Sequence, residues 1–208
     1  MIRRHKIKKL PALFLGFSLL VLSGCVAPLS SNFTARSLDK GKIGLDAGAI
    51  PLAEEAWCPA AKVAVGMTSN LDIGFHLEPF AIGLFGKYSF TNTIENGFSS
   101  AGLFGLGATA NGMYAYTGPI LSYKMDFFEP YFVGRYNYIR ISEDIEDIWF
   151  GDTIAAAGNY YYFQFTFGGI LWITRKFGLN FELSTFSGAP GFFELDGTIF
   201  LVGLKGRL

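Results

Sequence analysis

The chain has 208 residues, and its 17 Lys and Arg residues balance 17 Asp and Glu residues. A formal charge of zero gives no support to nucleic-acid binding, which requires a basic surface. The length is sufficient for one domain with a sizeable core, so we expect a single domain.

The N-terminal segment has the pattern of a secretory signal. "MIRRHKIKK" carries five Arg and Lys residues and is followed by the apolar run "LPALFLGFSLLVL". That run is too short to span a bilayer as a helix, whereas a basic segment followed by a short apolar segment is typical of exported proteins. We therefore expect residues 1–24 to be a signal peptide.

The signal ends in Leu22-Ser23-Gly24-Cys25, which resembles the lipobox of bacterial lipoproteins at every position. The resemblance implies cleavage before Cys25 and acylation of that residue by a diacylglyceryl group and a fatty acid such as palmitate. Several acyl chains form a durable anchor, because each buried methylene contributes about 0.8 kcal/mol. The alternative is an uncleaved anchor with a chance cysteine. Once Cys25 is acylated, Cys58 is the only other cysteine, so no intrachain disulfide can form.

The mature chain divides into a tether and a folded domain. Residues 26–41, "VAPLSSNFTARSLDKG", are polar and lack periodicity, as expected for a linker. We therefore expect residues 25–41 to be a lipid-anchored tether and residues 42–208 to be the domain.

The domain shows an alternation of period two that predicts strands. In "LDIGFHLE" the apolar residues occupy every second position, and "YYYFQFTFGGILW" and "GLNFELSTF" repeat the pattern. Candidate strands lie near 42–50, 61–68, 71–78, 80–90, 99–110, 113–124, 131–141, 160–173, 178–187 and 196–207. No helix of convincing length interrupts them, so an antiparallel meander is expected. Merging or splitting strands would change the number from ten to eight or twelve.

The alternation leaves open whether the apolar face points inward, as in a soluble barrel, or outward, as in a membrane barrel. The polar face is rich in Gly, Ser, Thr, Asn and Gln and poor in charge, which suits a narrow interior. Aromatic residues near the strand ends predict interfacial girdles; these residues are Tyr88, Phe90, Tyr136, Tyr138, Tyr160, Tyr161 and Trp172. We therefore expect an all-β, antiparallel, up-and-down transmembrane β-barrel.

The region from Thr34 onward, including "VAVGMTSNLDIGFHL" and "EPYFVGRYNY", resembles small bacterial outer-membrane β-barrel proteins. The resemblance implies location in the bacterial outer membrane and contact with its lipids. Short turns at 69–70, 126–130 and 174–176 would face the periplasm, with Cys25 in the inner leaflet. The long acidic segment 142–159 would be extracellular and could contact a protein partner. Such barrels often finish on Phe or Trp, whereas this sequence finishes on Leu208.

Polar residues on the predicted inner face are expected to form a network in the lumen, because a narrow lumen cannot leave charges unpaired. These residues are Asp72, His76, Glu78, Lys87, Arg135, Glu182 and Lys205. His76, the single histidine of the mature chain, and Glu78 are the weak catalytic candidates, since a histidine oriented by a carboxylate can serve a nucleophile. No nucleotide-binding or zinc-binding motif is present, so neither a cofactor nor a metal is expected.

Two classes of function therefore remain. The first is a non-enzymatic outer-membrane lipoprotein with a structural or interaction role, or with slow passage of small solutes. The second is a barrel enzyme that modifies lipid or peptide. No serine lies within two residues of His76, which favours the first class.

Overall fold

The computed structural model describes residues 33–53, 56–78, 81–92, 96–109, 111–146, 153–188 and 198–208. The expected signal peptide and the expected lipidation site Cys25 lie outside the described residues.

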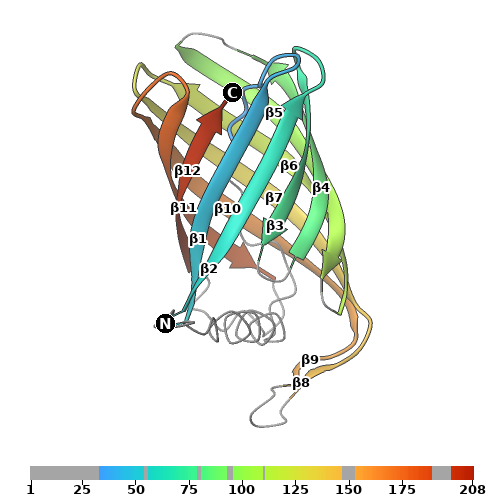
Figure 1. Cartoon of the computed structure of the whole chain (residues 1–208). Coiled ribbons are helices and arrows are strands. Elements are labelled where there is room, and N and C mark those ends of the chain that lie inside the picture. The colour runs from blue at the N-terminus through green and yellow to red at the C-terminus, as the bar shows by residue number, and fades with distance from the viewer. Residues whose placement is uncertain are drawn as a thin grey trace, which may run out of the picture.

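Ten strands form one closed antiparallel barrel (Figure 1). Each strand pairs with the next, and the ring is closed by β1 and β12, in which Gly44 lies opposite Arg207 and Ala49 opposite Val202. The strands are β1 Ile43–Ala53, β2 Ala56–Gly66, β3 Leu71–Glu78, β4 Ala81–Thr91, β5 Gly97–Thr109, β6 Gly112–Lys124, β7 Phe128–Ile141, β10 Gly158–Trp172, β11 Phe177–Ser187 and β12 Thr198–Arg207. The predicted fold class and strand number are confirmed.

The connection between β7 and β10 contains a small hairpin of its own. Strands β8 (Ile145–Glu146) and β9 (Thr153–Ala155) pair with each other and project beyond the barrel (Figure 1). The Asp144 carboxylate accepts a hydrogen bond of 2.6 Å from the Ala157 backbone N–H and ties the base of this hairpin together. The predicted loop 142–159 is therefore partly ordered as strands.

The two ends of the barrel differ in their connections. We call the turn end the one that carries the start of β1, the end of β12 and the connections after β2, β4, β6 and β10. Two of these connections use the same device, in which a threonine hydroxyl accepts hydrogen bonds from backbone N–H groups two and three residues ahead: Thr68 and Thr174. The opposite end, which carries the β8–β9 hairpin, is the loop end.

The apolar face of the barrel points outward. Leu84, Phe104 and Phe167 are 56%, 53% and 58% exposed, whereas the neighbouring inward residues Gln164 and Thr166 are buried. A continuous apolar exterior of this kind would be an unstable surface in water, but it matches the hydrocarbon core of a bilayer. The barrel is therefore of the membrane-spanning type. Among the described residues, no helix is long and apolar enough to cross a membrane.

The aromatic girdle is confirmed only in part. Tyr88, Phe90, Tyr136 and Tyr161 are exposed on the outer surface. Trp172 is instead only 8% exposed inside the barrel, and Tyr160 packs against the inner core. Both have even numbers on β10, whose odd-numbered residues Tyr161, Phe163, Phe165 and Phe167 face outward, so the strand's alternation turns them inward in spite of their place near its ends.

Candidate functional site

A short N-terminal segment fills the turn-end half of the lumen. Residues Phe33 to Leu38, which we call the lumen segment, are all 9% exposed or less. The chain then turns through Asp39 and Gly41, both with positive φ, and enters β1. This part of the chain was expected to belong to the polar tether 25–41, whereas it is packed inside the barrel.

Side chains of the wall satisfy the backbone of the lumen segment. Ser89 donates to the Ala35 carbonyl at 2.6 Å, and the Ala35 N–H donates to the Ser122 hydroxyl at 3.2 Å. The Lys87 ammonium donates to the carbonyls of Thr34 and Arg36 at 3.0 and 2.6 Å. A buried backbone outside a sheet needs such partners, so the polar residues of β4 and β6 explain why a segment without strand neighbours is stable here.

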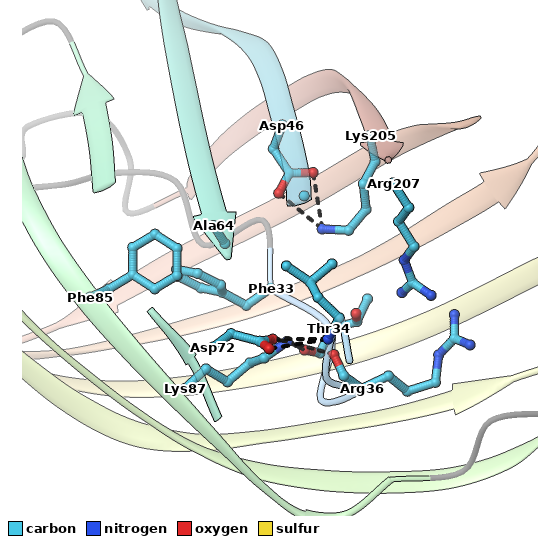
Figure 2. A pocket seen from close by; sticks show the side chains of 12 residues that line it. Phe33, Thr34, Arg36, Asp46, Ala64, Asp72, Phe85, Lys87, Lys205 and Arg207 are labelled. Atoms are coloured by element: carbon cyan, nitrogen blue, oxygen red, sulfur yellow. Dashed lines mark hydrogen bonds and ion pairs between the residues drawn. The ribbon is translucent and has the colours of Figure 1, made fainter. Parts of the chain in front are cut away.

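Asp72 of β3 joins the lumen segment to Lys87. Its carboxylate accepts hydrogen bonds from the Ser37 hydroxyl at 2.7 Å and the Leu38 N–H at 3.1 Å. It also forms an ion pair of 3.0 Å with Lys87 (Figure 2). All of these groups are buried. Asp72 thus neutralises Lys87, both of them predicted lumen residues, and also fixes the end of the lumen segment before it enters β1.

A second buried ion pair joins the lumen segment to β7. Arg36 donates from Nε and Nη2 to the two oxygens of Glu129, at 2.8 and 2.5 Å. The Trp172 indole N–H donates to the same carboxylate at 3.0 Å. This two-point geometry is the strong form of an arginine–carboxylate interaction.

Phe33 is the deepest described residue of the lumen segment. Its ring meets Phe85 edge to face with centroids 4.8 Å apart, and the Lys62 ammonium lies 4.3 Å from its centroid. Lys62 and Phe85 lie near the middle of β2 and β4, so the lumen segment extends from the turn end to about half the depth of the barrel.

The loop-end half of the lumen holds a network of aromatic and polar side chains. His76 hydrogen bonds through Nε2 to the Tyr114 hydroxyl, and Tyr114 stacks on Tyr116 with centroids 6.2 Å apart. Arg135 donates to Gln164 and lies 4.8 Å from the Tyr116 centroid. Glu182, a predicted lumen residue at the middle of β11, accepts a hydrogen bond of 2.7 Å from Tyr131.

All seven predicted lumen residues lie buried inside the barrel. They are Asp72, His76, Glu78, Lys87, Arg135, Glu182 and Lys205. Asp72 meets Lys87 directly, whereas Lys205 pairs at 3.0 Å with Asp46 of β1. His76 has a tyrosine hydroxyl as its hydrogen-bond partner, in the buried interior. Among the described residues, no group of His, Cys, Asp and Glu side chains could hold a metal ion.

Several members of the site were not predicted. Lys62, Asp46 and Glu129 face inward from β2, β1 and β7. The inward direction of Lys62 could have been predicted, because the apolar residues Val63 and Val65 occupy the outward positions of the same strand and Lys62 lies on the opposite face. The position of Arg36 could not, since it lies in an aperiodic polar segment whose place is set by tertiary contacts.

Little free space remains around the lumen segment. A cavity of about 30 Å³ lies between it and the wall, lined by residues that include Leu38, Asp46, Lys205 and Arg207 (Figure 2). This volume holds one or two water molecules. The lumen segment and its partners can stabilise a closed barrel, and this cavity is too small for a solute of more than a few atoms.

The fold and the filled lumen define a membrane-spanning β-barrel that carries part of its own chain as a plug. No protein-family model matches the sequence, and no curated protein matches it. Solved structures with a similar fold include the N-terminal β-barrel domain of OprF from Pseudomonas aeruginosa, Ail of Yersinia pestis with the heparin analogue sucrose octasulfate, and Ail alone. The OprF domain is 10% identical with a TM-score of 0.43, and the match covers 81% of this chain and 98% of that domain. Ail with the heparin analogue is 12% identical with a TM-score of 0.34, over 80% of this chain and 95% of that one. Ail alone is 11% identical with a TM-score of 0.30, over 81% of this chain and 99% of that one.

Proposed function

We propose that the protein is a lipoprotein of the bacterial outer membrane with a structural or interaction role, in which the barrel serves as a closed scaffold. The observation that carries the proposal is the lumen segment, which occupies the turn-end half of the interior and is fixed by Asp72, Lys87 and Glu129. A barrel built for passage would keep that space open. The outward apolar band and the signal with its lipobox support the location.

Conductance in planar lipid bilayers tests whether the barrel is closed. The purified wild-type protein should give no steady current. A variant with Gly-Ser repeats in place of residues 33–38, combined with Tyr114→Ala and Tyr116→Ala in the loop-end half, should conduct small ions, because both halves of the interior then lose filling. The matched control replaces Lys40 and Lys42, which are exposed, with serine and should stay closed. A steady current through the wild-type protein would favour slow solute passage and contradict the scaffold.

The β8–β9 hairpin is the part of the scaffold proposed to meet a partner outside the cell. It projects beyond the loop end (Figure 1), and Glu143 and Asp144 at its base are exposed. An acidic projection suits a partner with a basic surface. Protease added to intact cells should cut within 142–159 and leave the barrel folded. Cleavage only after the outer membrane is permeabilised would place the hairpin on the periplasmic side.

The lipid anchor is proposed at Cys25. Residues 26–32 connect it to Phe33 and reach about 25 Å when extended, so an anchor at a membrane surface is compatible with Phe33 in the lumen. Cys25→Ala should leave an uncut precursor that takes up no labelled fatty acid. Label retained by the Cys25→Ala variant would show that the lipobox prediction is wrong.

A further inference from the structure

The charges in the turn-end half of the lumen do not balance. Its three carboxylates each have one cation: Asp46 pairs with Lys205 at 3.0 Å, Asp72 with Lys87 at 3.0 Å and Glu129 with Arg36 at 2.5 Å. Two further cations, Lys124 of β6 and Arg207 of β12, form no ion pair with any residue that the structure describes. This half of the lumen therefore carries excess positive charge.

The excess charge gathers around one indole ring. The centroid of Trp172 lies 4.6 Å from the Arg207 guanidinium carbon, 6.0 Å from that of Arg36 and 6.0 Å from the Lys124 ammonium. The nearby Glu129 carboxylate already accepts bonds from Arg36 and from the indole N–H. The Nε atom of Arg207 is buried and has no hydrogen-bond partner within the described part of the chain.

The unpaired guanidinium borders the cavity of about 30 Å³ described above. Figure 2 shows the side chain of Arg36 from the lumen segment approaching that of Arg207 from β12, with the Asp46–Lys205 and Asp72–Lys87 pairs set apart from them. A single water molecule or a monatomic ion fits this volume. The two carboxylates that line the cavity are both bound to lysines, so the side next to the arginines is the one that favours an anion.

A guanidinium keeps its proton at neutral pH, so Arg207 cannot relieve its position by becoming neutral. Arg207 is partly buried, and a partly buried charge without an ion partner is unfavourable, because the face of an indole compensates it only partly. We propose that the lumen binds a small inorganic anion of halide size between Arg36 and Arg207, beside Trp172. The anion accepts hydrogen bonds from the N–H groups of Arg207 and stabilises the packing of the lumen segment against β12. This site is independent of the scaffold role, which requires no ligand.

Titration with sodium bromide tests the site, with sodium gluconate at equal ionic strength as the reference for screening. Samples are heated to increasing temperatures before electrophoresis, and the readout is the temperature at which the band of the folded barrel disappears from the gel. Above its dissociation constant, bromide should raise this temperature in the wild-type protein in proportion to the logarithm of its concentration, by roughly 3–6 °C for each tenfold increase. Gluconate, which is too large for the cavity, should produce only the weak effect of ionic strength.

Variants separate the site from general electrostatics. Arg207→Gln should lose the rise in this temperature with bromide, whereas Lys176→Gln, which removes an equal charge from an exposed turn, should keep it. Arg207→Lys preserves the charge and should require about tenfold more bromide. A bromide response in Arg207→Gln equal to that of the wild type would overturn the proposal, as would equal effects of bromide and gluconate.

Crystals of the wild-type protein soaked in bromide provide a test that depends on no variant. An anomalous peak should lie between the guanidinium groups of Arg36 and Arg207. An anomalous difference map without that peak at a bromide concentration well above the dissociation constant from the thermal experiment would exclude the site.

Discussion

Glycines on the inner wall allow aromatic rings to lie flat against the backbone of a neighbouring strand. A Cβ at Gly105 would lie 2.3 Å from the Tyr116 ring, and one at Gly168 would lie 2.2 Å from the Tyr131 ring. Tyr116 and Tyr131 in turn contact Arg135 and Glu182. Gly105 and Gly168 therefore leave room for the tyrosine rings of the neighbouring strands, and these tyrosines in turn contact the charged residues of the lumen.

Gly105→Ala should destabilise the barrel by about 1–3 kcal/mol, because the added methyl group forces Tyr116 away from the wall. The control is Gly206→Ala, where the nearest atom would be 3.7 Å away, so stability should barely change. Urea unfolding in detergent micelles measures both variants. Equal effects at the two positions would show that Tyr116 does not depend on Gly105.

Arg36→Ala should cost roughly 3–5 kcal/mol, because it leaves the buried Glu129 without its cation. Lys42→Ala breaks an exposed pair with Asp39 at 4.0 Å and should cost about 0–1 kcal/mol. The double variant Arg36→Ala, Glu129→Ala should lose less stability than the sum of the single variants. Additive losses in the same urea experiment would mean that the two residues do not interact.

The lumen segment is an element without regular secondary structure, and its order depends on the wall that surrounds it. Its backbone is bound by Ser89, Ser122 and Lys87, and its side chains are bound by Asp72 and Glu129. Five residues spread over β3, β4, β6 and β7 thus supply what a single neighbouring strand supplies elsewhere in the barrel.

Thiol labelling locates this element directly. In a Cys58→Ser background, Thr34→Cys should react very slowly with a maleimide, because Thr34 is 2% exposed inside the barrel. Lys40→Cys, six residues later and exposed, should react at the rate of a free thiol. Both cysteines should react fully after heat unfolding. Rapid labelling of Thr34→Cys in the folded protein would contradict its place in the lumen.

The strands were predictable because alternation is a local property. Every second residue of "LDIGFHLE" faces outward, and the inward direction of Asp72, His76 and Glu78 follows from the same count. Their partners were not predictable, because the meeting of Asp72 with Ser37, or of His76 with Tyr114, depends on the tertiary packing of segments far apart in the chain. The lumen segment itself has no alternation, so its polar composition predicted a tether.

Across the whole molecule, the outward apolar band determines how the barrel sits in a membrane. Phe165 lies at the middle of β10 on the outer face, and Tyr88 lies near the turn end of β4. Charge is costly at mid-depth and tolerated near the headgroups. If the outer face contacts lipid, the loss of stability caused by an added charge should depend on its depth in the membrane, whereas a soluble barrel would show no such dependence.

Phe165→Arg should destabilise the barrel in lipid vesicles by about 2–4 kcal/mol, whereas Tyr88→Arg should cost about 0–1 kcal/mol. Guanidinium unfolding from vesicles, followed by tryptophan fluorescence, measures the difference. Equal small effects at both positions would indicate that the outer face meets water at every depth.

The contacts of the lumen segment set a limit on when it can reach its final place during synthesis. The segment leads directly into β1, so it is made before any strand of the barrel. Its partners Asp72, Ser89, Ser122 and Glu129 belong to β3, β4, β6 and β7, which follow it in the chain. The lumen segment therefore precedes the barrel in synthesis, but its contacts cannot be complete until the first seven strands exist.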